Sequence, residues 1–178
     1  MMNVAERKQA TAPAEAQRWL ESFEAALLAR DTAAAAALFL NDGFWRDILA
    51  FSWTIQTMAG RPAIEVALRQ TQSRAQVRNF HIPVKRTPPR WISRAGEENI
   101  EALFEFESAF GPCAGVLRLR PDDQGKLGAW TLNTNLQELK GYEEEFKRRG
   151  EPDSTRDLGA DNWADRLIKV EKRSGTST

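Results

Sequence analysis

The sequence predicts an α+β domain in which helices cover one face of an antiparallel sheet. Helical periodicity dominates the first 75 residues, where apolar residues recur at three- and four-residue steps. Four segments with strand-like alternation follow, and turns rich in Pro and Gly separate them. A run of helices followed by a run of strands is typical of the α+β class.

The first helix is expected at residues 13–29, after a loose polar lead-in at residues 1–12. Pro13 suits the first turn of a helix. The apolar stripe of this helix consists of Trp19, Phe23, Ala26 and Leu27. A short alanine-rich helix then follows with Asp31 as its cap, and the Asn-Asp-Gly turn at residues 41–43 is expected to end it.

The stretch FWRDILAFSW at residues 44–53 has the composition of a strand but places an acid on an apolar face. Strand alternation points five side chains to the same side: Trp45, Asp47, Leu49, Phe51 and Trp53. Strand structure is expected to continue to about Met58. Gly60-Arg61-Pro62 then ends it and starts a third helix at residues 63–74.

The four later strands are expected at residues 77–85, 99–110, 114–120 and 127–139. The second alternates apolar with acidic residues and the third apolar with basic residues, so their polar faces could pair across the ladder. On the last strand, the polar row of Asn133, Asn135 and Gln137 predicts a solvated outer face or a dimer surface. The domain is expected to span residues 13–141, with a charged tail or linker at 142–178.

Composition argues against several classes of protein. Lys plus Arg and Asp plus Glu are 25 each, so the chain lacks the basic excess of nucleic-acid-binding proteins. No apolar run approaches the roughly 20 residues that span a bilayer. No secretory signal is visible, and the single cysteine, Cys113, is expected to be a small buried or turn residue. A cytoplasmic location is therefore predicted.

Cofactor and metal sites are not expected in this chain. It contains no G-x-G-x-x-G fingerprint for a flavin or nicotinamide cofactor. His81 is the only histidine and no cluster has metal-ligand spacing, which argues against a metal site.

The segments LFLNDGFWRD and TMAGRPAI, followed by a long meander, resemble the nuclear-transport-factor-2-like (SnoaL-like) superfamily. This resemblance implies a curved sheet wrapped around about three N-terminal helices, a cone with an apolar pocket, and a homodimer. FWRDILAFSWTIQTMAGRPAI and AWTLNTNLQELKGYEE are more narrowly similar to the N-terminal domain of flavin-containing monooxygenase-like proteins. That likeness implies a flavin-dependent oxidoreductase domain as partner.

Asp47 is the main catalytic candidate, and two interpretations of it remain open. Burial among apolar side chains disfavours the charged form of a carboxylate, which suits a general base acting next to a carbonyl. Alternatively, Asp47 forms a structural ion pair with Arg46 or Arg61, or caps a turn. His81 is a further catalytic candidate, although strand alternation turns it away from Phe80 and Ile82.

Six aromatic residues could line a pocket for a small apolar ligand or simply form core: Trp45, Phe51, Trp53, Phe104, Phe106 and Trp130. The first hypothesis is therefore an accessory ligand-binding or dimerisation domain of the kind that precedes flavin monooxygenase-like enzymes. The alternative is a cofactor-free isomerase, dehydratase or cyclase for an apolar carbonyl compound, with Asp47 as base. A third is a binding or dimerisation protein without an enzyme partner.

Overall fold

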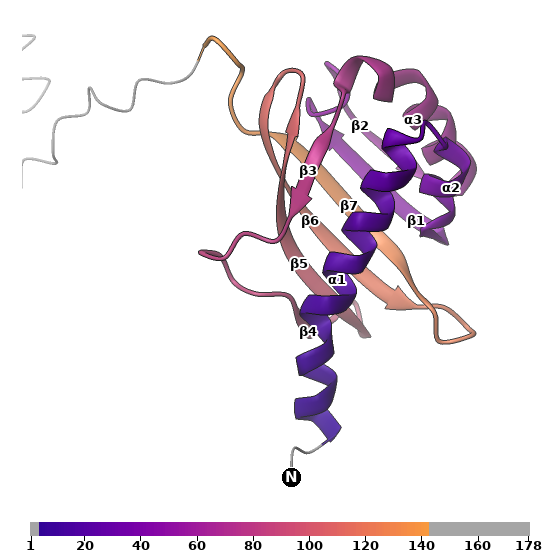
Figure 1. The fold of residues 1–178 in the computed structure, drawn as a ribbon. Helices are drawn as coiled ribbons and strands as arrows, with labels where there is room; N and C mark the ends of the chain where they lie inside the picture. The colour runs from indigo at the N-terminus through magenta and orange to yellow at the C-terminus, as the bar shows by residue number, and fades with distance from the viewer. Residues whose placement is uncertain (1–3, 143–178) are drawn as a thin grey trace, which may run out of the picture. The chain divides into compact units, whose positions relative to one another are not determined.

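The computed structural model describes residues 4–142, which form three helices and a seven-stranded sheet (Figure 1). The elements are α1 (Val4–Leu28), α2 (Thr32–Ala37), β1 (Phe39–Ile48), β2 (Ile55–Ala59), α3 (Arg61–Ala75), β3 (Arg78–His81), β4 (Arg90–Arg94), β5 (Glu97–Ser108), β6 (Gly111–Pro121) and β7 (Leu127–Leu136). The α+β class and the curved sheet around N-terminal helices are confirmed. None of the helices described is long and apolar enough to cross a membrane.

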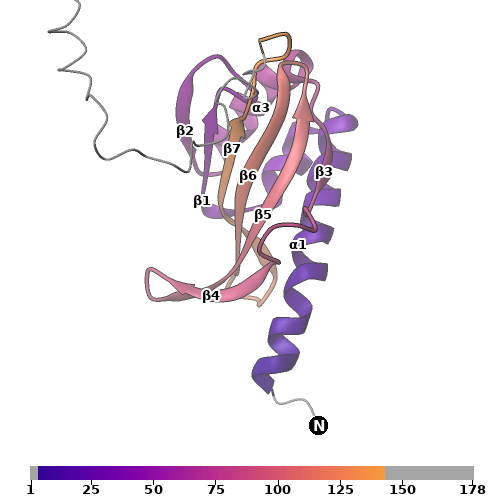
Figure 2. The same cartoon turned by 90° about the vertical axis from the view of Figure 1, so that its left-hand side faces the viewer.

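The sheet is mixed rather than purely antiparallel, which corrects the expectation from sequence. Its strand order is β2-β1-β7-β6-β5-β3, with β4 paired to β5, and β1 runs parallel to β7. The parallel pair joins strands from opposite ends of the domain, and local alternation carries no information about such a pairing. Figure 2 shows α1 along one face of the sheet, and no helix of residues 4–142 covers the other face.

Helix α1 begins at Val4, so residues 4–12 are helical where a loose lead-in was expected, and Pro13 lies inside the helix. Tertiary contacts explain the longer helix. The amide of Gln9 exchanges two hydrogen bonds with the backbone of Trp91 on β4, at 2.9 and 3.0 Å. Ala12 and Ala16 are fully buried, while the Pro13 side chain is exposed. These contacts offset the missing hydrogen bond of a proline within a helix.

The short second helix has the predicted cap, since the Asp31 side chain accepts a hydrogen bond from the Ala34 amide at 2.9 Å. The Asn-Asp-Gly segment at residues 41–43, however, is an irregularity within β1 instead of the turn that ends α2. Gly43 is needed there because a Cβ would lie 2.7 Å from the carbonyl oxygen of Ala129. Two approaching backbones therefore select this glycine.

The two ends of the stretch at residues 44–53 have different structures. β1 stops at Ile48, because Leu49 adopts a left-handed backbone with a φ of 65°. Residues 49–54 form a loop before β2 returns antiparallel to β1. Of the five side chains, only Trp45 and Asp47 lie on the inner face of β1, whereas Phe51 reaches the interior from the loop and Trp53 is exposed.

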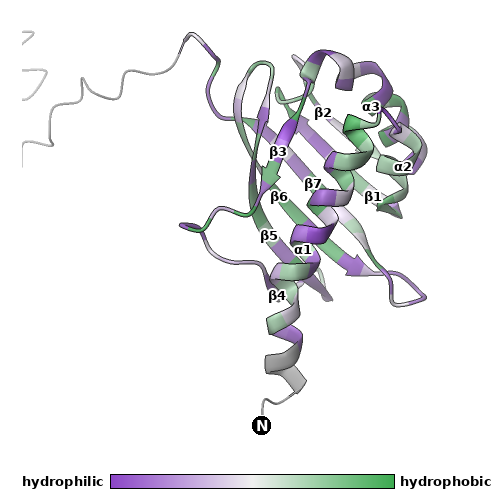
Figure 3. Ribbon diagram, viewed as in Figure 1, coloured by the Kyte–Doolittle hydropathy of each residue, from purple (hydrophilic) through white to green (hydrophobic). Residues whose placement is uncertain are grey.

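Apolar residues alternate with polar ones along the strands (Figure 3), and the buried apolar residues of strands and helices form one core. Aromatic rings form a continuous cluster there. Phe23 of α1 contacts Phe80 at a centroid distance of 5.8 Å, and Phe80 stacks on Phe106 at 4.6 Å. Phe106 in turn approaches Phe51 at 6.1 Å. The space between helices and sheet is thus occupied by packed rings.

Candidate functional site

Asp47 lies fully buried at the end of β1, and its carboxylate is surrounded by hydrogen-bond donors. Oδ1 accepts from the Thr134 hydroxyl at 2.8 Å and from the Phe51 amide at 3.1 Å. Oδ2 accepts from both the amide and the hydroxyl of Ser52 at 2.9 Å. These bonds fix the loop at residues 49–54 to the strand that precedes it. They also supply the stabilisation that a buried charge requires.

Thr134 connects this carboxylate to the parallel strand pair. It lies directly opposite Asp47 on β7, and its hydroxyl accepts a hydrogen bond from Trp45 Nε1 at 3.0 Å. Because the hydroxyl donates its only proton to Asp47, the three side chains form a closed polar network inside an aromatic core. The network joins residues 87 and 89 positions apart in sequence.

The structural ion pair predicted between Asp47 and an arginine is wrong. Arg46 directly precedes Asp47 on β1 and points to the opposite face, where it donates to the Thr57 hydroxyl at 3.2 Å. Arg61 donates from Nε to the Phe39 carbonyl at 2.7 Å. Backbone amides and hydroxyls thus donate to the Asp47 carboxylate in place of the expected arginine. A serine five residues after an aspartate at a strand end was the available signal for this turn cap.

The six candidate pocket aromatics do not line one pocket. Trp45, Phe51, Phe104 and Phe106 are buried core residues. Trp53 is 49 % exposed and packs on Phe110 outside the sheet. A bulge in the β6–β7 ladder displaces Trp130 from the inner face, and the Arg120 guanidinium lies 5.3 Å from its ring.

The interior next to these rings is filled. Phe104 lies opposite Gly115 across the β5–β6 ladder, and its ring occupies the position where a Cβ of residue 115 would stand. The five hollows that are clearest on the described surface have other walls, and Asp47 lines none of them. A substrate therefore has no visible path to the Asp47 carboxylate.

Within the part of the chain that the structure describes, His81 and Cys113 form no hydrogen bond with the Asp47 network, although Cys113 is near enough for the Asp47 charge to act on its thiol. His81 is exposed, with Nδ1 2.9 Å from the Asn79 carbonyl and Nε2 3.9 Å from Glu105. Cys113 is 2 % exposed, and desolvation raises the pKa of its thiol to about 11, which suppresses the reactive thiolate. Within residues 4–142, no group of three potential ligand side chains converges as a metal site.

No family model and no curated protein matches the sequence, but solved structures match the fold. A domain of unknown function with a cystatin-like fold from Nostoc punctiforme gives a TM-score of 0.54 at 12% identity, covering 92% of this chain and 96% of that one. Nuclear transport factor 2 from Cryptosporidium parvum gives 0.51 at 13% identity, covering 76% and 99%. The chain has the nuclear-transport-factor-2-like fold.

A protein from Catenulispora acidiphila shares this nuclear-transport-factor-2-like fold, with a TM-score of 0.52 at 17% identity over 71% of this chain and 91% of that one. At such identities the likeness concerns the fold alone. The broad resemblance predicted from sequence is therefore confirmed at the level of the fold. The narrower resemblance to flavin monooxygenase-like proteins stays a prediction.

Proposed function

We propose that this chain is a non-catalytic dimerisation module, in which the outer face of the sheet pairs with a second copy. The observation that carries the proposal is a band of mostly uncharged side chains across the middle of that face. This neutral band consists of Phe44, Ile48, Ile55, Thr57, Leu103, Ala114, Val116, Thr131, Asn133 and Asn135.

The backbone register aligns the neutral band in rows across five strands. Asn133 lies opposite both Arg46 of β1 and Val116 of β6, and Val116 lies opposite Leu103 of β5. Phe44 and Ile55 are large apolar residues with 41 % and 60 % of their surface exposed. An apolar and neutral centre of this kind is typical of the buried part of an interface between copies.

Charged pairs lie at the β5 side of the neutral band. Glu101 bonds Arg118 at 2.9 Å, and Glu105 bonds Arg86 at 3.0 Å. Arg46 lies between Phe44 and Ile48 of the band on β1, and it has no carboxylate partner among the ion pairs of residues 4–142. A two-fold axis along the strands between β7 and β6 would lay β1 of one copy over β5 of the other. Arg46 would then face the acidic residues of β5, which makes the surface self-complementary.

The oligomeric state tests this proposal directly. Light scattering after size exclusion should give twice the chain mass for the wild type. Val116→Arg should give the chain mass, because it places a charge at the centre of the neutral band. Val66→Arg is the matched control, since Val66 is 50 % exposed on α3, and it should stay dimeric. A monomeric wild type, or a dimeric Val116→Arg variant, would contradict the proposal.

The second candidate function is the cofactor-free isomerase, dehydratase or cyclase with Asp47 as base. It is supported by a fully buried carboxylate that has no cationic side chain in the described ion pairs. For this function Asp47→Asn must abolish turnover of an enolisable apolar carbonyl substrate and leave stability unchanged. The sealed network around Asp47 favours the opposite result.

A flavin-dependent oxidoreductase as partner is supported by the sequence resemblance at residues 44–64 and 129–144. The partner is tested by purifying tagged chain from its native cell extract and measuring flavin absorbance in the eluate. Coenzyme should co-purify with the tagged chain and be lost after washing in high salt. Eluates without flavin absorbance would contradict the flavin-dependent partner but would not bear on the proposed dimer.

A further inference from the structure

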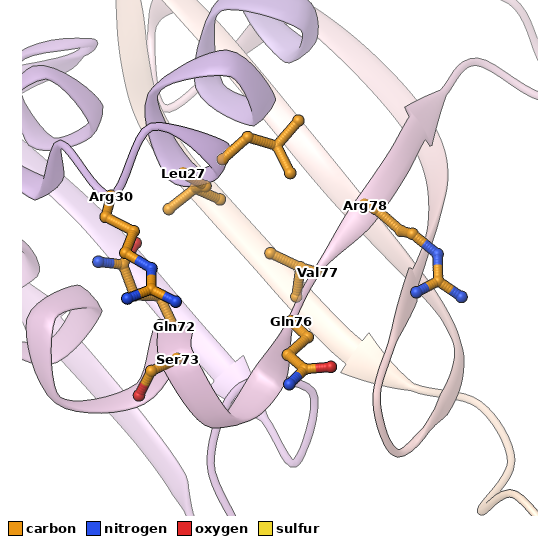
Figure 4. Close-up of a pocket in the computed structure, with 8 residues that line it drawn as sticks. Leu27, Arg30, Gln72, Ser73, Gln76, Val77 and Arg78 are labelled. Atoms are coloured by element: carbon orange, nitrogen blue, oxygen red, sulfur yellow. The ribbon is translucent and has the colours of Figure 1, made fainter.

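A hollow of about 330 Å³ lies where α1 and α3 end, on the helical side of the domain and away from the neutral band (Figure 4). Leu27, Leu28 and Val77 form its apolar wall. Leu28 is 65 % exposed, so it offers apolar surface at the edge of the hollow. The volume is at the lower end of the roughly 300–1,000 Å³ of ligand pockets, so it suits a small metabolite.

Both helices end at this hollow in left-handed turns. Arg30 follows α1 with a φ of 58°, and its amide bonds the Leu27 carbonyl at 3.0 Å. Gln76 caps α3 with a φ of 45°, and its amide bonds the Gln72 carbonyl at 3.0 Å. The carboxyl ends of two helices carry partial negative charge, so this side of the hollow favours a cation or a hydrogen-bond donor.

Gln72 adds a specific demand for a donor. Its side-chain Oε1 is buried and has no hydrogen-bond partner among the described residues. A buried acceptor without a partner is destabilising, and native structures contain few of them. Other atoms of the Gln72 side chain line the hollow, so a rotation of its amide would present this oxygen to an N–H group placed there.

Arg30, in contrast, favours an anionic group in the hollow. Its side chain is exposed, and the ion pairs of residues 4–142 give it no carboxylate partner. Arg78, also at the rim, differs because its guanidinium points away in Figure 4 and bonds Glu107 at 2.9 Å. Hydrogen bonds from Asn79 and Arg78 lower the pKa of Glu107, so that pair is charged at neutral pH. Arg30 is therefore the cation left for a ligand.

We propose that this hollow binds a free α-amino acid with an aliphatic side chain. The Gln72 amide turns toward the hollow, its Oε1 accepts a hydrogen bond from the ammonium group, and the ammonium group faces the two helix ends. The carboxylate pairs with the Arg30 guanidinium, and the aliphatic side chain covers Leu28 and Val77. One zwitterion with an aliphatic side chain matches the apolar wall, the acceptor of Gln72 and the guanidinium of Arg30 together. A simple anion or a simple cation matches only some of these groups. The site does not depend on the proposed dimer.

The test is titration of the full chain with L-leucine, followed by amide shifts in two-dimensional NMR spectra. The amides of Arg30, Gln76 and Val77 should shift and saturate. Leucinamide, which lacks the carboxylate, and 4-methylpentanoate, which lacks the ammonium, should each bind about tenfold more weakly or worse. Absence of saturable shifts at about 10 mM leucine, well above a 1 mM dissociation constant, overturns the proposal.

Two variants separate the two ends of the ligand. Arg30→Gln should weaken leucine at least about tenfold while leaving leucinamide unchanged. Gln72→Leu removes the orphaned acceptor, so it should retain or raise thermal stability and still lose leucine binding. Arg18→Gln, on α1 but outside the hollow, is the matched control and should bind as the wild type does. Equal leucine affinity in all three variants would place the ligand elsewhere and overturn the proposal.

Discussion

Asp47 shows how one residue can look catalytic in sequence and act structurally in the fold. Its carboxylate accepts hydrogen bonds from Phe51, Ser52 and Thr134, and it is fully buried. A general base needs a free lone pair directed at a substrate, and here the donors occupy both oxygens. The residue therefore anchors the loop that lets β2 turn back along β1.

Asp47→Asn should destabilise the fold by about 3 kcal/mol. An asparagine keeps one acceptor but turns an amide N–H₂ toward groups that are themselves donors, either Ser52 or Thr134. Urea denaturation measures the change in the free energy of unfolding. Asp123→Asn, at an exposed position, should change it by less than about 0.5 kcal/mol. Equal stability of wild type and Asp47→Asn would support the catalytic interpretation instead.

Cys113 links burial to alkaline stability. Desolvation raises the pKa of its thiol from 9.0 to about 11, so the unfolded chain ionises this thiol first. The free energy of unfolding should thus be unaffected by Cys113 below pH 9 and fall as pH rises from 9 to about 11. Denaturation curves across this window should fall by about 1–2 kcal/mol more in wild type than in Cys113→Ala. Parallel curves would show that the thiol is not desolvated.

At the scale of elements, β5 and β6 depend on a pairing of unequal side chains. The Phe104 ring covers Gly115, and the polar faces of the same strands pair as the alternation predicts, with Glu101 opposite Arg118. Glycine weakens a strand on its own, so its presence here reflects the ring above it.

Gly115→Ala should destabilise the domain by about 3 kcal/mol. The new methyl group would collide with the Phe104 ring and with the backbone carbonyl of Asn133, and neither can withdraw without moving a strand. Thermal unfolding followed by circular dichroism gives the shift in midpoint. Val116→Ala, the next residue on the outer face, should lose far less stability in the monomer. A native midpoint for Gly115→Ala would mean that the ring leaves the position shown.

The sequence was sufficient for the elements whose signals are local. The stripe of α1, the Asp31 cap and the alternation of β5 and β6 follow from periodicity and side-chain chemistry. The sequence was insufficient where contacts between distant residues determine the length of an element or the face on which a side chain lies. Gln9 bound to Trp91 extends α1 past Pro13, and the bulge at Trp130 moves a large ring out of the core.

The candidate site was predicted only in part for the same reason. Burial of Asp47 follows from alternation, whereas its partners follow from the chain reversal after Leu49 and from Thr134 on a strand nearly 90 residues away. The hollow at the helix ends gave no sequence signal. It is composed of loop and cap residues such as Arg30 and Gln76, which carry no periodic pattern.

At the scale of the molecule, the parallel β1–β7 pair joins the first and last strands of the described chain. The hydrogen bond from Trp45 to Thr134 spans 89 positions, whereas β5 and β6 form a local hairpin. Contacts that close long loops form late when local structure can form first. Thr134 is thus expected to acquire its contacts after the main folding barrier.

Thr134→Val tests this order, since it keeps the shape and removes the hydroxyl that both Trp45 and Asp47 use. The substitution should lower the free energy of unfolding by about 2 kcal/mol, mainly because the variant unfolds faster. Stopped-flow chevron plots separate the two rates. Leu117→Ala, in the core of the local hairpin, should slow folding to a larger degree. If both variants divided their loss of stability in the same way between slower folding and faster unfolding, the β1–β7 pair would not close late.

The ring of Phe104 fills space in the interior that a smaller side chain would leave empty. The rings of Phe80 and Phe106 lie 5.9 and 5.7 Å from it, so two further aromatic side chains border the space that it fills. Truncating Phe104 to alanine would leave a chamber walled by hydrocarbon, and engineered chambers of that kind stay dry and admit xenon or benzene. A single substitution within the packed rings would thus give this domain an internal binding site for a small apolar guest.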